Sequence, residues 1–262
     1  MFSKSFINTY ISTHFHVSIA VAAMCGTVSY LLEVALSLTD IFGVGISSWL
    51  GYYYITQLSQ RKFLLTHFLI PSVLSVFCFW YWLQLNGLGR IFYICSSVLV
   101  LFYPKIEGIN FHGLRQKPGW KILIVALAWS FFCVGIPYSK IHSTVCWQLS
   151  LGVLLFSLTY VTAAMIPFEI RDETTDSPQL QTIVNRYGIV KSKAIGYGLT
   201  VIAGVCLVFP PISLGVKIWI LVSLGLLALG IYKSPSQQKY FCEFWIEGIP
   251  IAMFLGVYLL GF

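Results

Sequence analysis

Four carboxylates lie within eight positions of this chain, in the segment IPFEIRDETTDSPQLQTI at 166–183. They are Glu169, Asp172, Glu173 and Asp176, and the whole chain has only nine acidic residues. If the segment is helical, Glu169, Asp172 and Asp176 share one face. Carboxylates stacked in this way repel one another unless a cation lies among them, and Mg²⁺ takes oxygen ligands that it bridges to phosphates. This arrangement would suit Mg²⁺ on Asp172 and Asp176, with Glu169 or Glu173 as an additional ligand.

A solvated acidic loop is the alternative interpretation of the same segment. Arg171 and Arg186 would then neutralise part of its charge. Two aspartates separated by three residues are common by chance, so the spacing by itself does not decide between a metal site and a loop.

The rest of the chain is unusually apolar for a protein in water. Of its 262 residues, 58% are hydrophobic and 10% are charged, and the mean hydropathy is +0.83. Soluble domains carry about 25% charged residues. The composition predicts an integral membrane protein, in which each spanning helix needs about 20 mostly apolar residues. The single domain is expected to cover 1–262.

Apolar runs without strand-like alternation predict an all-α bundle of nine transmembrane helices. Pro167 is expected to end or kink the sixth helix, because proline removes a helical hydrogen bond. The nine predicted spans are 15–37, 40–58, 64–85, 89–104, 120–137, 145–168, 192–210, 212–232 and 243–261.

The nine predicted spans distribute the basic residues unequally between the two sides of the membrane. Thirteen of the sixteen Lys and Arg residues fall on the side of the N-terminus and three on the other. Positive residues favour cytoplasmic loops, so the N-terminus is expected inside and the C-terminus on the opposite side of the membrane, for which the inner or plasma membrane of a bacterium is expected. The net charge of +7 is read as a topology signal and not as a nucleic-acid site. Two inner loops are long, near 105–120 and 169–191. A polar site is therefore expected at the cytoplasmic opening of the bundle, which we call the cytoplasmic mouth.

The string IRDETTD…QTIVNRYGIVKSK resembles the second aspartate-rich motif of the UbiA-type prenyltransferase superfamily. That resemblance implies a nine-helix membrane fold with its site at the cytoplasmic mouth. The matching positions are Arg171, Asp172, Asp176, Thr182, Gly188, and Lys191 or Lys193.

The first aspartate-rich motif of that superfamily is missing. Its expected place reads GYYYITQLSQRKF, at 51–63, and contains no acidic residue. Arg61 and Lys62 are expected to supply the missing positive charge directly, and Tyr54 stands at the displaced motif position. The candidate substrate-binding residues are therefore Arg61, Lys62, Arg115, Lys117, Arg171, Lys191 and Tyr54, and Lys121 lies in the same basic loop.

The resemblance implies a Mg²⁺-dependent transferase, with Asp172 and Asp176 as its catalytic residues. It would move a prenyl group from a polyprenyl diphosphate to an aromatic or other lipophilic acceptor. Two alternatives stay open: a non-catalytic relative that binds isoprenoid lipids, and a small-molecule transporter. Glu33, Glu243 and Glu247 lie at span ends, where a transporter could use them. Glu243 and Glu247 also fit a helix start, where negative charge is favourable.

Overall fold

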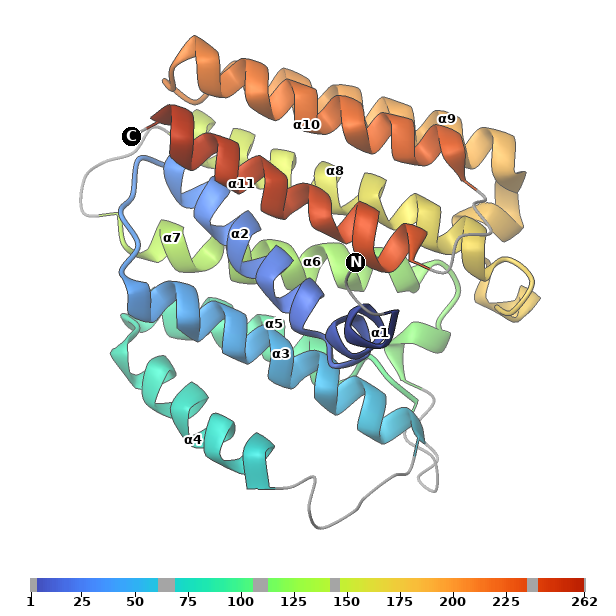
Figure 1. The fold of residues 1–262 in the computed structure, drawn as a ribbon, viewed down its shortest axis with the longest axis horizontal. Helices are drawn as coiled ribbons and strands as arrows, with labels where there is room; N and C mark the ends of the chain where they lie inside the picture. The colour runs from blue at the N-terminus through green and yellow to red at the C-terminus, as the bar shows by residue number, and fades with distance from the viewer. Residues whose placement is uncertain (1–3, 61–68, 106–112, 142–146, 235–239, 262) are drawn as a thin grey trace.

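The computed structural model describes residues 4–60, 69–105, 113–141, 147–234 and 240–261, and within these ranges every regular element is a helix (Figure 1). The prediction of an all-α protein is confirmed. The long helices are α2 (Phe15–Leu31), α3 (Leu38–Gln60), α4 (Leu69–Gln84), α5 (Gly87–Leu101), α6 (Trp120–Cys133), α8 (Trp147–Asp172), α9 (Ile183–Cys206), α10 (Leu214–Lys233) and α11 (Glu247–Gly261). The short elements are α1 (Lys4–Ser12), η2 (Leu114–Gln116), α7 (Gly135–Ser139), η3 (Pro178–Leu180) and the π-helical turn η4 (Phe241–Ile246).

Each predicted span overlaps one of these helices. In the part of the chain that the structure describes, five helical stretches are long and apolar enough to cross a membrane. They are 120–139, 147–172, 183–206, 214–233 and 241–261. The helices α2, α4 and α5 are apolar but shorter. The count of nine spans therefore stays a prediction.

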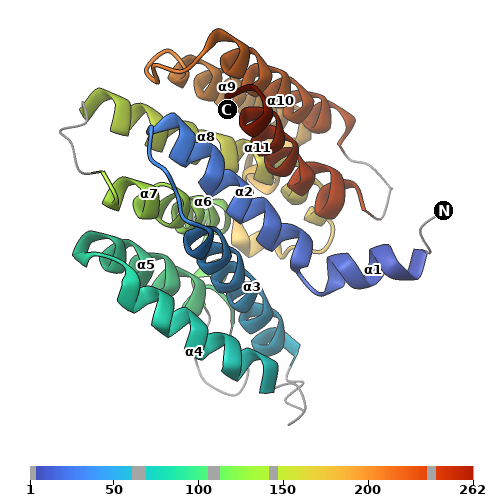
Figure 2. The same ribbon diagram turned by 60° about the vertical axis from the view of Figure 1, so that its left-hand side comes forward.

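The helices pack side by side as one bundle. The helix α8 packs against α9 and α6, α2 packs against α11 and α3, and α10 packs against α9 and α11. Figure 1 shows α9 and α10 along one edge of the bundle and α4 along the opposite edge. The short helix α1, which the sequence did not predict, extends away from the other helices (Figure 2).

Helix α8 differs from its prediction at its C-terminal end. It does not end at Pro167 but continues to Asp172. Proline is costly inside a helix, yet the surrounding fold holds this one in place, with Pro167 itself buried. The next helix, α9, begins at Ile183, nine positions earlier than the predicted start at 192. Glu169 and Asp172 therefore belong to α8, whereas Glu173 and Asp176 lie in the turn that follows it.

Two histidines hold η4 and α3 against the start of α2. His14 has a left-handed backbone conformation (φ 63°), which separates α1 from α2. Its Nε2 lies 2.9 Å from Thr56 Oγ1 on α3, and Nε2 of His16 donates to the carbonyl of Phe244 at 2.9 Å. Burial lowers the pKa of the His14 imidazole, which favours the neutral ring. These contacts place η4 and the C-terminal part of α3 next to the start of α2.

Candidate functional site

The end of α8 brings the two predicted aspartates together. The backbone N–H of Asp176 donates to the carbonyl of Asp172 at 2.8 Å, and that of Thr175 does so at 2.9 Å. This bonding adds about one helical turn after the helix itself has ended. The carboxylates of Asp172 and Asp176 therefore face the same side, as their spacing predicted.

Lys121 lies between these two carboxylates. Its ammonium nitrogen is 3.1 Å from Asp172 Oδ2 and 2.6 Å from Asp176 Oδ2. The side chain starts in the first turn of α6 and is buried. Just before it, the N–H of Gly119 donates to the carbonyl of Leu180 at 2.9 Å, which fixes the start of α6 against η3. The pairing therefore depends on contacts between segments that are distant in sequence.

Two arginines complete the set of charges. Arg171 Nε lies 2.8 Å from Asp172 Oδ1, and its Nη1 lies 3.0 Å from Glu243 Oε1 on η4. Arg115, on η2, has Nη2 3.7 Å from Asp176 Oδ1. We call Arg115, Lys121, Arg171, Asp172, Asp176 and Glu243 the polar cluster. In it, three cationic side chains meet three carboxylates.

A cavity of about 710 Å³ lies beside the polar cluster. Its wall is mostly apolar and aromatic and comes from α2, α3, α4, α5, α6, α8, η4 and α11. Phe168 connects the two regions, because it lines the cavity and its ring centroid lies 5.2 Å from the guanidinium carbon of Arg171. Tyr103 also lines the cavity, and its carbonyl accepts from the N–H of Arg115 at 3.0 Å.

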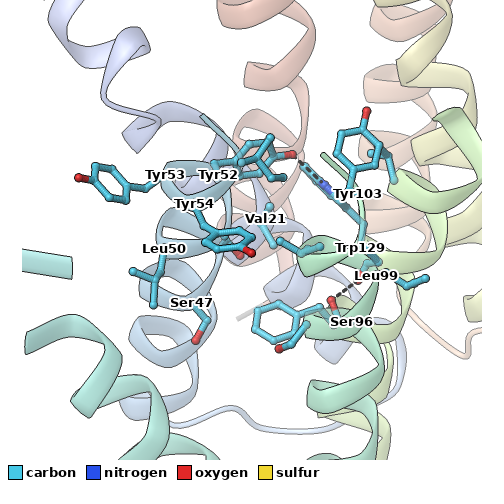
Figure 3. Close-up of a pocket in the computed structure, with 18 of the residues that line it drawn as sticks. Val21, Ser47, Leu50, Tyr52, Tyr53, Tyr54, Ser96, Leu99, Tyr103 and Trp129 are labelled. Atoms are coloured by element: carbon cyan, nitrogen blue, oxygen red, sulfur yellow. Dashed lines mark hydrogen bonds between the residues drawn. The ribbon is translucent and has the colours of Figure 1, made fainter. Parts of the chain in front are cut away.

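The cavity wall also carries a few polar groups. Figure 3 shows Tyr52 and Trp129 facing each other, with Trp129 Nε1 donating to the Tyr52 hydroxyl at 3.1 Å. The Tyr160 hydroxyl and Gln57 Oε1 are buried and have no hydrogen-bond partner among the described residues. Glu247 adds a carboxylate to the wall. The cavity suits a largely apolar ligand that has a few hydrogen-bonding atoms.

Comparison with known proteins identifies the fold. No protein-family model and no curated protein matches the chain. A solved apo structure of a UbiA homologue from Aeropyrum pernix K1 superposes with a TM-score of 0.71 at 13% identity, over 94% of this chain and 98% of the other. A UbiA homologue from Archaeoglobus fulgidus, solved with bound Cd²⁺, gives 0.62 at 11% identity, over 95% and 98%. This chain has the UbiA fold. The membrane fold that the 171–193 motif implied is thereby confirmed, and with its long apolar helices the chain is an integral membrane protein.

Within the UbiA fold, the predicted site residues are only partly brought together. Asp172, Asp176, Arg171 and Arg115 belong to the polar cluster, and Tyr54 lines the cavity. Four other predicted residues are not in the polar cluster or the cavity wall as described. Lys117 is exposed, with its ammonium 5.6 Å from the ring centroid of Trp120, and Lys191 is exposed on α9. Arg61 and Lys62 lie outside the described residues.

Glu169 is hydrogen-bonded to the backbone at the start of α9. Its Oε2 accepts from the backbone N–H of Ile183 at 2.9 Å, and the side chain is buried. Next to it, the Thr182 hydroxyl accepts from the N–H of Asn185 at 3.2 Å. Both side chains satisfy N–H groups in the first turn of α9, as caps do. The predicted role of Glu169 as a metal ligand would require this contact to break.

The residues as arranged do not fit Mg²⁺. Oxygen ligands lie about 2.1 Å from Mg²⁺. An ion that bridged Asp172 Oδ2 and Asp176 Oδ2 would occupy the place of the Lys121 ammonium, which contacts both oxygens. Among the described residues, no group of three or more His, Cys, Asp or Glu side chains is placed to hold a metal ion.

Sequence reasoning missed three contributors to the site. Lys121 was expected to close over a diphosphate with its basic loop, and its pairing with two aspartates was not predicted. Glu243 was read as a helix start or a transporter residue, and its pairing with Arg171 was not predicted. Phe168 directly follows Pro167. It would have been expected on the inner face of the bundle if the helix had been predicted to continue through the proline, as it does.

Proposed function

We propose that this protein is a membrane prenyltransferase. The prenyl chain of a polyprenyl diphosphate would lie in the cavity, and the diphosphate would lie at the polar cluster. The observation that carries the proposal is the direct contact of these two regions through Phe168 and Arg171. A substrate with an apolar tail and an anionic head matches this pairing.

The cationic side chains would bind the diphosphate as it leaves. The allylic C–O bond breaks and its electron pair stays on the diphosphate oxygen. Arg115 and Lys121 are placed to stabilise that negative charge, and preorganised cations are effective at such a task. Lys117, Arg61, Lys62 and Lys191 remain candidates from the sequence for further contacts.

The aromatic wall would shield the carbocation left on the prenyl chain. Tyr52, Tyr54, Tyr103, Trp129 and Phe168 all line the cavity. Aromatic faces attract cations and exclude water, which would otherwise capture the carbocation. A nucleophilic atom of the acceptor then forms the new bond to carbon and loses a proton.

The polar groups of the cavity wall favour an acceptor that carries hydrogen-bonding atoms. A plain hydrocarbon would leave the Tyr160 hydroxyl and Gln57 Oε1 unpaired, which is costly in a buried site. Glu247 provides an acceptor for a hydroxyl or N–H group. We propose a lipophilic acceptor with at least one such group.

The sequence motif predicts that the activity depends on Mg²⁺. The Archaeoglobus fulgidus homologue was solved with Cd²⁺, which supports testing divalent cations on this chain. The mechanism proposed here assigns no step to a metal ion, because Lys121 lies between the two aspartates. The cytoplasmic position of the mouth and a bacterial membrane remain part of the same proposal.

Binding of a non-hydrolysable prenyl diphosphate analogue to the purified protein in detergent tests this function. Saturable binding that Arg115→Ala weakens about tenfold supports the proposal, since a lost charge-assisted hydrogen bond has an effect of that size. Lys217→Ala, which alters a cation at the start of α10 outside the polar cluster, is the control and should bind normally. Absence of binding at every prenyl length, with and without Mg²⁺, would overturn the proposal.

A turnover assay then separates the enzyme from a non-catalytic relative. The missing first aspartate motif is the feature that favours the relative. Prenyl diphosphate that is bound and consumed with an acceptor supports the transferase. Binding without consumption across phenols, quinone precursors and glycerol phosphates would assign a binding protein.

A further inference from the structure

Every carboxylate oxygen of the two motif aspartates has a cationic partner. Asp172 Oδ1 lies 2.8 Å from Arg171 Nε, and its Oδ2 lies 3.1 Å from Lys121 Nζ. Asp176 Oδ1 lies 3.7 Å from Arg115 Nη2, and its Oδ2 lies 2.6 Å from Lys121 Nζ. A divalent cation would have to displace one of these partners and then lie beside the other positive charges.

The burial of this group makes displacement costly. The side chains of Lys121, Asp172 and Asp176 are 6%, 18% and 8% exposed. An ammonium held this far from water keeps its charge only while its carboxylates remain close. Moving Lys121 aside for a metal ion would leave that ammonium without a counter-ion.

Among the described residues, no third carboxylate completes a metal site with Asp172 and Asp176. The place of the first aspartate motif, 51–63, has no acidic residue, and its sequence ends in Arg61, Lys62 and Phe63. Glu169 is engaged with the N–H of Ile183. Of the described side chains, two aspartates would have to hold the ion, and the Lys121 ammonium is already in contact with both.

We propose that Lys121 takes the place of the metal ion in this UbiA fold. Asp172 and Asp176 are then internal counter-ions that fix Lys121, Arg115 and Arg171 in position. The polar cluster binds an anionic head group through these cationic side chains, without a resident divalent cation. The anion-binding part of this inference rests on the function proposed above; the exclusion of the metal does not.

Titration of Mn²⁺ alone, followed by electron paramagnetic resonance, tests the exclusion of the metal. The variants are Asp172→Asn and Asp176→Asn, and each keeps one carboxylate against Lys121, which favours folding. Glu173→Gln is the matched control, because it removes a charge from the same turn. The amount of Mn²⁺ bound per protein should be the same for the wild type and for both asparagine variants. A saturable Mn²⁺ site that either asparagine variant removes, and that Glu173→Gln retains, would overturn the proposal even if no prenyl diphosphate binds.

Binding of the prenyl diphosphate analogue in EDTA tests the role of the cations. Wild-type affinity should stay within about twofold when EDTA replaces Mg²⁺, and Lys121→Gln should weaken binding about tenfold in EDTA. Glu173→Gln, which removes a charge from the same turn outside the polar cluster, should keep the wild-type affinity. Binding that EDTA abolishes in the wild type contradicts the inference. Absence of binding under all conditions contradicts the proposed function instead.

Discussion

The ammonium of Lys121 lies 2.6 Å from the carboxylate of Asp176, although the two residues are 55 positions apart in the chain. Lys121 opens α6, and Asp176 follows the end of α8. The contact joins two helices at the rim of the cavity and sets the charge of the mouth. A motif that reads as acidic in the sequence is therefore close to neutral in the folded protein.

Removing the Lys121 charge should destabilise the protein strongly. Lys121→Met leaves two buried carboxylates without their shared partner, and breaking a buried pair costs about 3–5 kcal/mol. A double-mutant cycle in mixed micelles should show that Asp176→Asn costs less in the Lys121→Met background than in the wild type. Equal costs in both backgrounds would mean that the contact contributes nothing.

Glu169 should stabilise the protein because its carboxylate caps the first turn of α9. Glu169→Ala removes the acceptor for the Ile183 N–H and is expected to cost about 1–2 kcal/mol, as the loss of a helix cap does. Glu169→Gln keeps an acceptor oxygen and should recover at least half of that loss. Unfolding in denaturant measures both, with Glu173→Ala as the control. Equal losses for Ala and Gln would argue that the charge matters and not the cap.

An alanine in place of Gly188 should lower the stability of the protein, whereas an alanine in place of Gly198 should not. Gly188 has φ 76° and ψ 166° inside α9, a conformation that is almost confined to glycine. Gly188→Ala is expected to cost about 1–3 kcal/mol through backbone strain alone, since no atom lies within 4 Å of the added Cβ. Gly198→Ala, also with open space around its Cβ but without positive φ, should be neutral or stabilising. Thermal unfolding of the two variants compares them directly.

Filling the cavity should shorten the ligand that the protein accepts. Ala164 lies on the cavity wall, one turn from both Tyr160 and Phe168 on α8. Ala164→Phe is expected to weaken binding of a twenty-carbon prenyl diphosphate analogue about tenfold, with little change for a ten-carbon one, because the added ring takes space that only the longer chain needs. Leu155→Phe changes an exposed position of the same helix and is the control. An equal loss for both chain lengths would place the prenyl chain elsewhere.

The amino-acid sequence by itself determined the helical character of this protein and the local spacing of its acidic motif. Long apolar runs have to form helices in lipid, because each backbone N–H and C=O needs a partner within its own segment. The four-residue spacing of Asp172 and Asp176 likewise sets them one turn apart, and the backbone bond between them follows from that spacing. These are local consequences of the chain, which is why the fold class could be predicted.

The tertiary structure decided what the motif contacts. Helix α8 passes through Pro167 because packing outweighs the local cost of proline, and this extension carries Phe168 to the cavity wall and Asp172 to the polar cluster. The partners of the carboxylates come from η2, α6 and η4, and no local pattern encodes which lysine meets which aspartate. Charges separated by 55 positions meet only after the helices have packed, so the pairing of Lys121 with Asp176 became visible only in the folded chain.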